Sequence, residues 1–387
     1  MKITDNSTKF LQVIETMPAD RSPYMLFDLD QFQENCNTFK NLFPKIKLLY
    51  AIKAFYSPQS LMAAKEIVDG FDVASPNEAL AMVKNDIDPS RIEVSNPVKS
   101  KKSIEEFTKL GIKYYTVQSK DEIDKIYQIN KHAVITIRIK VNDGYSLVPL
   151  SDKFGCDPFY APELLQYAQN IGLTARGVSF HVGSQLLDLE YWQSAIQLAN
   201  DIIQTARKNG VKANIVNIGG GFCAQYFDTD PSIEDTAKII NSLLDTSIDY
   251  VAEPGRYLVA NAAVTISTVI AVERRREENW VFIDAGRFQS FLGADRYEIF
   301  PYMPSVLSSE SKAVKERDKI FNAILTGPTC DSQDIIANDV SLPLSIAPGD
   351  ILVFPNTGAY TTVYGSHFNG FSPPEIINIK NNKIEER

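Results

Sequence analysis

Eight short strand-like runs recur along the 387-residue chain, and helix-like stretches separate most of them. A strand followed by a helix, repeated eight times, predicts a (β/α)8 barrel of the TIM type with parallel strands. The runs are Leu48–Lys53, Gly70–Ser75, Arg91–Asn96, Lys113–Ser119, Val134–Val141, Ala175–Ser184, Ala213–Phe222 and Asp249–Tyr257. Because the C-terminal ends of barrel strands meet at one face, the polar residues that end these runs are expected to form one site.

The chain is longer than the roughly 250 residues that such a barrel needs, so a second domain is expected. From about Val264 onward the runs are β-rich and separated by turns such as Gly327-Pro328. These runs are Thr265–Val272, Trp280–Asp284, Phe321–Leu325 and Asp350–Phe354. We therefore expect a barrel over residues 28–263, and a mostly antiparallel β domain over residues 264–387 that residues 1–27 join through a strand at Tyr24–Phe27.

Helix signals support the barrel. Ser57-Pro58 and Ser75-Pro76 each place a capping residue before a proline just after a strand, which is typical of a short loop that starts a helix. Longer helices are predicted over Asp188–Asn209 and Ser232–Thr246, and the stretch Asp28–Leu42 predicts a helix ahead of the first barrel strand.

Composition narrows the class of partner. The net charge of −9 argues against nucleic acid or an anionic membrane as partner, because no excess of cations is available to neutralise phosphates. Four cysteines are scattered without a CxxC pair, and the first ten residues lack an apolar secretory core. We expect a protein of the reducing cytoplasm, with no metal among its ligands.

Four motifs at strand ends could carry chemistry, although each has a structural alternative. Lys53 ends an apolar run, where burial would favour the neutral amine, but taken alone a lysine in this position more often extends to solvent. The glycines at 219–221 would let backbone N–H groups approach a phosphate, or form a plain tight turn. Glu253 and Arg256 could bind a ligand or pair with each other, and His181 could be a core histidine.

One small molecule would use all four groups at once. The amine of Lys53 suits an aldehyde, the glycine turn suits a phosphate, the imidazole of His181 suits an aromatic ring, and the carboxylate of Glu253 suits a pyridine nitrogen. The combination predicts pyridoxal 5′-phosphate as cofactor.

The motifs also occur in an order that resembles a known family. From Tyr24 to Pro374 the chain contains, in sequence, YAIKA, GFDVAS, SFHVGSQ, GGGF, EPGR, GPTCDSQD and TGAYTTVYGSHFNGF. This set resembles the pyridoxal-phosphate decarboxylases of the alanine-racemase fold (fold type III), and within them the bacterial ornithine and lysine decarboxylases.

The resemblance implies roles for individual residues. Lys53 would form the Schiff base, His181 would stack on the cofactor ring, and Glu253 would pair with the pyridinium nitrogen. Cys330 would deliver or govern the proton that restores the amine, although a lone cysteine can also be buried filler. The remaining cofactor contacts would come from Asp72 and Arg138 in the pocket, and from Ser184, Gly220, Gly221, Arg256 and Tyr360 around the phosphate.

Two aspartates indicate the substrate class. Asp284 and Asp331 match the family's ligands for a distal ammonium group, which must be paired when it leaves water. Diaminopimelate decarboxylases carry a glutamate where this chain has Asp331, so a simple diamine tail is favoured. The resemblance further implies a homodimer with shared active sites, in which Lys153 pairs with Asp334 across the twofold axis and Cys330, Asp331 and Phe368 reach the partner's site.

The expected reaction is decarboxylation of a basic L-amino acid, with conversion of L-ornithine to putrescine in polyamine biosynthesis placed first. Lysine decarboxylation to cadaverine, or activity on both, is the alternative, because one methylene is worth only about 1–3 kcal/mol of discrimination. Decarboxylation of diaminopimelate or of a siderophore precursor, amino-acid racemisation, and a catalytically dead regulatory relative rank below these.

Overall fold

The computed structural model describes residues 5–18, 21–293, 302–315 and 319–385. The chain divides into two compact units. One, here called the barrel unit, comprises Gln33–Leu258, and the other, here called the β unit, combines Met1–Phe32 with Val259–Arg387. The domain limits predicted from the sequence, 27/28 and 263/264, each differ from these unit limits by five residues.

The barrel unit contains a closed ring of parallel strands, in the order β10-β11-β2-β3-β4-β5-β6-β8. The strands are β2 (Ile46–Ala51), β3 (Gly70–Val73), β4 (Ile92–Val94), β5 (Tyr114–Val117), β6 (Val134–Arg138), β8 (Thr174–Ser179), β10 (Ile215–Asn217) and β11 (Asp249–Ala252). Each overlaps one of the eight predicted runs, so the predicted (β/α)8 barrel is confirmed.

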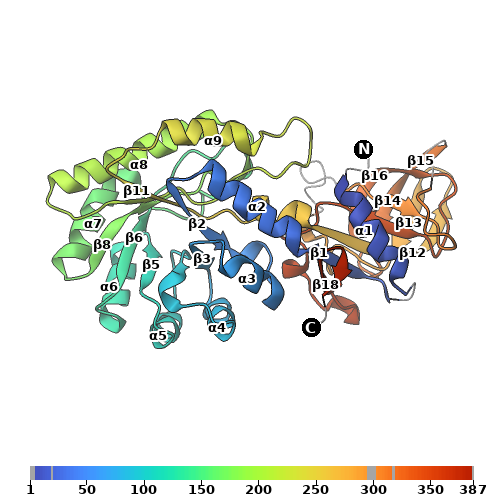
Figure 1. Ribbon diagram of the computed structural model, residues 1–387, viewed down its shortest axis with the longest axis horizontal. Helices are drawn as coiled ribbons and strands as arrows, with labels where there is room; N and C mark the ends of the chain where they lie inside the picture. Colours follow the sequence, from blue (N-terminus) through green and yellow to red (C-terminus); the bar gives the residue numbers. More distant parts are fainter. Residues whose placement is uncertain (1–4, 19–20, 294–301, 316–318, 386–387) are drawn as a thin grey trace. The chain divides into compact units, whose positions relative to one another are not determined.

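Helices cover the outside of the ring, with α8 and α9 on one side and α3 to α6 on the other (Figure 1). Ser57 caps α3 through a reciprocal capping box with Ser60, and Ser75 caps α4, which confirms both predicted starts. The helices are α2 (Leu29–Leu42), α3 (Pro58–Lys65), α4 (Pro76–Lys84), α5 (Lys101–Lys109), α6 (Lys120–Ile129), α7 (Ala161–Asn170), α8 (Glu190–Lys208) and α9 (Ile233–Ser242). None of the helices in the described parts of the chain has the length and apolarity needed to cross a bilayer.

The barrel strands end earlier than the sequence predicted. Strand β2 ends at Ala51, so Lys53 lies in a short 3-10 turn over Ile52–Ala54. Likewise β8 ends at Ser179, and Ser184 begins β9 (Ser184–Leu186), which pairs with β7 (Ser146–Val148) outside the barrel. The apolar pattern continues past the last ladder hydrogen bond because the first loop residues are also buried, which is why it overstated the strands.

The β unit is built on one sheet, in the order β16-β15-β13-β12-β1-β18-β19, with β17 joined to β12 and β14. Its strands are β1 (Tyr24–Asp28), β12 (Ala263–Arg274), β13 (Asn279–Ile283), β14 (Ser305–Leu307), β15 (Ile320–Thr326), β16 (Ile335–Pro343), β17 (Ile351–Phe354), β18 (Glu375–Lys380) and β19 (Lys383–Ile384). Only β1–β18 and β13–β15 pair in parallel, so the mostly antiparallel arrangement is confirmed for the described strands.

The sequence reading missed a helix in the β unit. Helix α1 (Asp5–Thr16) buries Phe10, Val13 and Ile14 in a core that includes Leu26 of β1. Lys312 closes its C-terminal end, because the Nζ ammonium donates to the carbonyls of three residues in and just after the last turn of α1, at 2.7 to 3.1 Å. This cap comes from nearly 300 residues away, so no local pattern announces it.

An ion pair lies inside the barrel. Arg176 on β8 donates Nη1–H to Glu93 Oε1 on β4 at 2.8 Å, and its Nη2 contacts the second carboxylate oxygen. Arg176 also donates Nε–H to Thr136 Oγ1 on β6 at 2.7 Å. Strands β4 and β8 are not neighbours in the ring, so these side chains meet across its interior.

We expect Arg176→Met to lower the free energy of unfolding of the barrel by about 3–5 kcal/mol, because it leaves the Glu93 carboxylate buried without its cation. The double variant Arg176→Met/Glu93→Met should recover most of that loss, since it removes both charges together. Denaturant unfolding of the three proteins measures the difference. An equal loss in the single and double variants would contradict a charge-pairing role.

Candidate active site

Lys53 and Asp72 form an ion pair at the C-terminal end of neighbouring strands. Lys53 follows β2 and its Nζ contacts Asp72 Oδ2 on β3, where Asp72 stands in register with Ala51. The Asp72 side chain is 2% exposed, whereas that of Lys53 is 40% exposed. The amine is therefore held by a buried carboxylate and still reachable from outside the barrel.

Glu253 is a buried carboxylate whose orientation is fixed by two neutral donors. It directly follows β11, and its Oε1 accepts a hydrogen bond from Ser95 Oγ and another from Asn217 Nδ2, each at 2.6 Å. Burial and the neighbouring Asp72 raise the pKa of Glu253 to about 7, while Lys53 and the Ser95 hydroxyl act to lower it. Both hydrogen bonds are made to Oε1, so Oε2 can accept a hydrogen bond from a ligand that enters the site.

His181 is a half-buried imidazole in the loop after β8. Its Nδ1 accepts a hydrogen bond from the Gly183 backbone N–H at 3.0 Å. Burial, followed by the positive charges of Arg138 and Lys53, lowers the pKa of His181 well below 6.5. A neutral imidazole that accepts at Nδ1 carries its proton on Nε2, so the structure sets the tautomer as well as the charge.

The glycine turn after β10 brings backbone against this imidazole. Gly219 and Gly221 adopt φ values of +68° and +119°, which favour glycine. A Cβ atom on Gly220 would stand 3.0 Å from His181 Nε2 and 2.9 Å from the Glu253 carbonyl oxygen. A side chain at Gly220 would therefore crowd the imidazole, whereas one at Gly219 or Gly221 would collide with Phe180 or Val182.

Arg256, Ser184 and Tyr226 form a cationic, hydrogen-bonding group beside the turn. Arg256 donates from Nε to Ser184 Oγ and from Nη1 to Tyr226 Oη, both at 3.1 Å. The loop that carries Ser184 is joined to the turn, because the Leu186 N–H donates to the Gly221 carbonyl at 3.0 Å. A guanidinium, hydroxyls and a glycine-rich backbone are the groups that bind phosphate in proteins.

Arg138 at the end of β6 adds a second buried guanidinium. Burial lowers the pKa of Arg138 below its usual range, although the charges of Glu253, Asp72 and Asp143 act to raise it. The guanidinium lies 5.3 Å from the centre of the Phe154 ring. Lys53, Asp72, Arg138, His181 and Glu253 thus act on one another's charge, and the structure brings these five predicted residues into one cluster.

The donor set fits pyridoxal 5′-phosphate. Each part of that molecule has a matching group in the site. The amine of Lys53 suits the aldehyde, and Oε2 of Glu253 suits the ring nitrogen. The neutral imidazole of His181 suits the ring, and the group around Arg256 suits the phosphate. The glycine turn supports the fit, because side chains in its place would collide with His181 or Val182.

The other predicted residues, except Lys153, belong to the β unit. Strands β13 and β15 are parallel, so Asp284 after β13 and the loop 327–334 after β15 leave the sheet at the same edge. Asp284 Oδ1 accepts from Ser267 Oγ at 2.7 Å and from the Thr268 N–H at 2.9 Å, and burial raises its pKa. The anchored carboxylate cannot swing away from this edge.

Cys330 is exposed and lies next to the turn Phe368–Gly370. Its Sγ is 3.5 Å from Asn369 Oδ1, and the Phe368 ring packs 4.8 Å from that of Phe288. Tyr360 adopts a positive φ of 56° and its ring lies 6.1 Å from that of Tyr364. The structure therefore brings Cys330 and the Phe368 turn together, and their predicted roles stay predictions.

Asp334 ties two turns of the β unit together. Its Oδ1 accepts from the Arg287 N–H at 2.7 Å, and its Oδ2 accepts from the N–H and hydroxyl of Thr329 at 3.0 and 2.7 Å. The residue is 0% exposed, whereas Lys153 in the barrel unit is exposed. The Lys153–Asp334 pair between subunits stays a prediction, and it would require this turn to open. Asp331 Oδ1 accepts from the Gln333 N–H at 2.8 Å, which leaves Oδ2 for other groups.

Sequence reasoning missed three members of the site. Ser95 and Asn217 orient Glu253, and Tyr226 receives a hydrogen bond from Arg256. Ser95 stands near the end of the predicted run Arg91–Asn96, so its position was a signal, whereas Asn217 lies in the middle of the predicted run Ala213–Phe222. Nothing in the sequence showed which strand end they would face.

Comparison with known proteins identifies relatives over nearly the whole chain. A family model described as pyridoxal-dependent decarboxylase, pyridoxal binding domain, matches residues 29–260. A chloroplastic ornithine decarboxylase of Nicotiana glauca is 31% identical over 370 residues, which are 94% of this chain and 85% of the relative. A lysine/ornithine decarboxylase of Selenomonas ruminantium is 30% identical over 363 residues, which are 92% of this chain and 89% of the relative.

Solved structures agree with these relatives. The arginine decarboxylase of Paramecium bursaria Chlorella virus superposes with a TM-score of 0.88 at 26% identity. The match covers 97% of this chain and all of the viral chain. The similarity therefore includes the barrel unit and the β unit alike.

We expect the imidazole of His181 to stay neutral in the cofactor-free protein well below the ordinary ionisation midpoint of 6.5, because burial and two cations disfavour its charged form. Nitrogen NMR of the histidine rings, with His181→Gln to assign the signal, measures both the charge and the proton-bearing nitrogen. An ionisation midpoint near the ordinary 6.5, or a proton on Nδ1, would contradict the geometry.

Proposed function

Because this chain belongs to the pyridoxal-dependent decarboxylases, we propose that it releases CO2 from the α-carboxyl group of a basic L-amino acid, with L-ornithine as the preferred substrate and putrescine as product. The observation that carries the proposal is the cluster of Lys53, His181 and Glu253 at one end of the barrel, in which the Glu253 carboxylate is buried and the Lys53 amine stays reachable. The relatives named above act on ornithine, lysine or arginine, which all carry a second cationic group.

When bound, pyridoxal phosphate supplies an electron sink for the charge that CO2 release leaves on the substrate. Glu253 would hold a proton on the ring nitrogen through Oε2, since Ser95 and Asn217 occupy Oε1. Lys53 would hold the aldehyde carbon, and neutral His181 would cover the ring without adding a competing charge. Arg256, Ser184, Gly220, Gly221 and Tyr360 would hold the phosphate, and Asp72 and Arg138 would line the pocket.

The β unit would supply the substrate end of the site. Asp284 and Asp331 would pair with the distal ammonium, and both are carboxylates with an oxygen already anchored by hydrogen bonds. Cys330 would return a proton to Cα, and its exposed thiol beside the Phe368 turn is free to meet a partner.

We also infer a homodimer whose two active sites each combine both subunits, with Lys153 and Asp334 pairing between them. Exposed Phe368 next to Cys330 supports an interface at this edge of the β unit. A cytoplasmic location and a role in polyamine biosynthesis belong to the same proposal, and four cysteines without a disulfide suit a reducing compartment.

The lysine alternative rests on the same residues. The hydrogen bonds that hold Asp284 and Asp331 do not favour the side chain of ornithine over that of lysine, which is longer by one methylene. A racemase or a catalytically dead relative fits less well, because the first has no use for two distal aspartates and the second tends to lose cofactor residues that are present here.

We expect the purified protein to release CO2 from ornithine with a higher kcat/KM than from lysine, arginine or diaminopimelate. Lys53→Ala should lose the visible-edge absorbance of bound cofactor and nearly all turnover, whereas Lys238→Ala, at an exposed lysine, should keep both. Steady-state kinetics with CO2 detection measure this. No CO2 from any of the four amino acids, or normal turnover by Lys53→Ala, would refute the proposal.

Shared sites can be tested by mixing inactive chains. Lys53→Ala and Cys330→Ala homodimers should each be nearly inactive, and a mixture should regain activity because one of the two heterodimer sites receives both intact residues. The regained fraction should approach one quarter of the wild-type kcat when the subunits exchange fully, since half of the dimers are then mixed. A mixture with no recovery, despite exchange proved by native mass spectrometry, would rule out sites that combine both subunits.

A further inference from the structure

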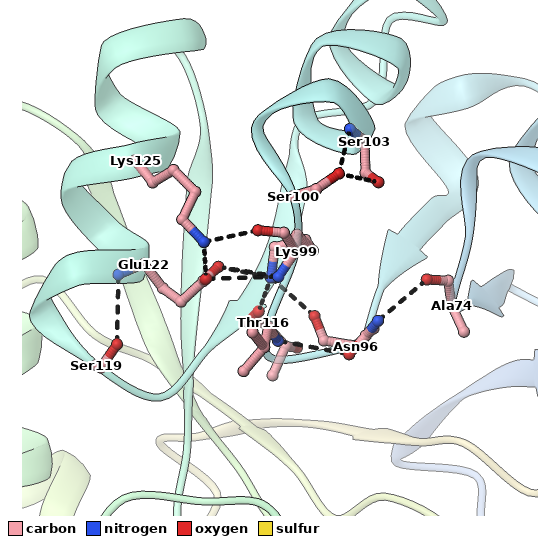
Figure 2. A network of polar contacts seen from close by, with 10 residues as sticks. Ala74, Asn96, Lys99, Ser100, Ser103, Thr116, Ser119, Glu122 and Lys125 are labelled. Carbon is pink, nitrogen blue, oxygen red and sulfur yellow. Dashed lines mark hydrogen bonds and ion pairs between the residues drawn. The ribbon is translucent and has the colours of Figure 1, made fainter.

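A buried ammonium group lies close to the site and has no part in the chemistry proposed above. Lys99 follows β4, its side chain is 1% exposed, and Nζ donates to the carbonyls of Asn96 at 2.8 Å and Thr116 at 2.7 Å. Nζ also lies 3.7 Å from Glu122 Oε2 (Figure 2). Burying a charge costs free energy unless the charge is paired and hydrogen-bonded. A role is therefore expected for the buried ammonium of Lys99.

Glu122 and Lys125 of α6 complete the network. Glu122 accepts from the Lys99 backbone N–H, and its Oε1 contacts the ammonium of Lys125. Lys125 in turn donates to the Lys99 carbonyl at 2.6 Å (Figure 2). Lys99 is therefore held at its N–H, its carbonyl and its ammonium, and burial lowers the pKa of that ammonium to about 8.

The polar network around Lys99, here called the clamp, holds the loop that carries Ser95 in place. At the start of this loop the Ser95 N–H donates to the Val73 carbonyl at 3.2 Å, and Ser95 Oγ donates to Glu253 Oε1 at 2.6 Å. At its end Lys99 reaches back to the carbonyl of Asn96, the residue next to Ser95. A hydroxyl-to-carboxylate bond of this length depends strictly on distance and angle, so it depends on where the loop is fixed.

We propose that Lys99 is a positioning residue for the decarboxylation: it fixes the loop 95–99 on β5 and α6 so that Ser95 holds the Glu253 carboxylate in place. The inference rests on the proposed function, in which Glu253 meets the ring nitrogen of the cofactor. A clamp that only stabilised the barrel would be indifferent to Ser95. A positioning clamp loses its effect on the reaction when the Ser95 hydroxyl is removed.

A double-mutant cycle tests this on the whole enzyme loaded with pyridoxal phosphate. Ser95→Ala and Lys99→Met should each lower kcat about tenfold with little change in KM, since each removes one hydrogen bond to a charged acceptor or its support. The double variant should be no slower than the slower single variant. Lys102→Met, at an 84% exposed side chain of α5, is the matched control and should behave as wild type. Wild-type kcat in Lys99→Met, or losses that multiply in the double variant, would overturn the proposal.

Absorbance of the bound cofactor gives a second readout that needs no turnover. The quantity measured is the pH at which half of the pH-dependent change in cofactor absorbance has occurred, here called the midpoint. Ser95→Ala and Lys99→Met should move this midpoint in the same direction and by the same amount. These substitutions leave unchanged the other charged groups that act on Glu253, which are Asp72, Lys53, Glu93 and Arg138. A midpoint that moves in Ser95→Ala but stays at the wild-type value in Lys99→Met would refute the positioning role, even if no amino acid proves to be a substrate.

One further variant protects the test against misfolding. Lys99→Met leaves Glu122 buried with only Lys125 as counter-charge, so the double change Lys99→Met/Glu122→Met removes both buried charges together. If Lys99→Met fails to fold, this variant takes its place in the cycle and in the absorbance titration. The same kcat loss and the same midpoint shift as in Ser95→Ala support the proposal, and wild-type values for both contradict it.

Discussion

The site depends on a carboxylate that is kept in a place where carboxylates prefer to be neutral. Glu253 is buried, and burial together with Asp72 raises its pKa to about 7. Two neutral donors, Ser95 just after β4 and Asn217 at the end of β10, hold one of its oxygens and favour the charged form. A closed barrel makes this possible, because it sends the ends of non-adjacent strands to the same face and fixes their spacing.

The two units divide the proposed task. The barrel unit carries the groups suited to the cofactor, and the β unit carries the acids suited to a second ammonium and the thiol suited to a proton transfer. In the β unit, the buried carboxylate of Asp334 holds together the turns that follow β13 and β15. Buried acids that accept several hydrogen bonds thus organise both units, although only Glu253 is proposed to touch the cofactor.

Much of the fold and of the site could be predicted from the sequence, and the features that could not be predicted share a cause. The eight barrel strands are buried on both faces and read as apolar runs, and serine-proline pairs mark helix starts, so both were predictable. Helix α1 went unrecognised because its stability comes from packing in a distant core. Ser95 and Asn217 act on Glu253 across 158 and 36 residues of sequence, and Lys99 acts through a carbonyl oxygen. Contacts of these kinds leave no local pattern.

The central claim is that Lys53 holds pyridoxal phosphate in the cluster organised by Glu253. Borohydride reduction of the loaded protein, followed by peptide mass spectrometry, tests it most directly, because reduction makes the bond between the amine and the cofactor permanent. The account predicts a single reduced adduct, on the peptide that contains Lys53. An adduct on another lysine, or none in protein that binds the cofactor, would contradict it.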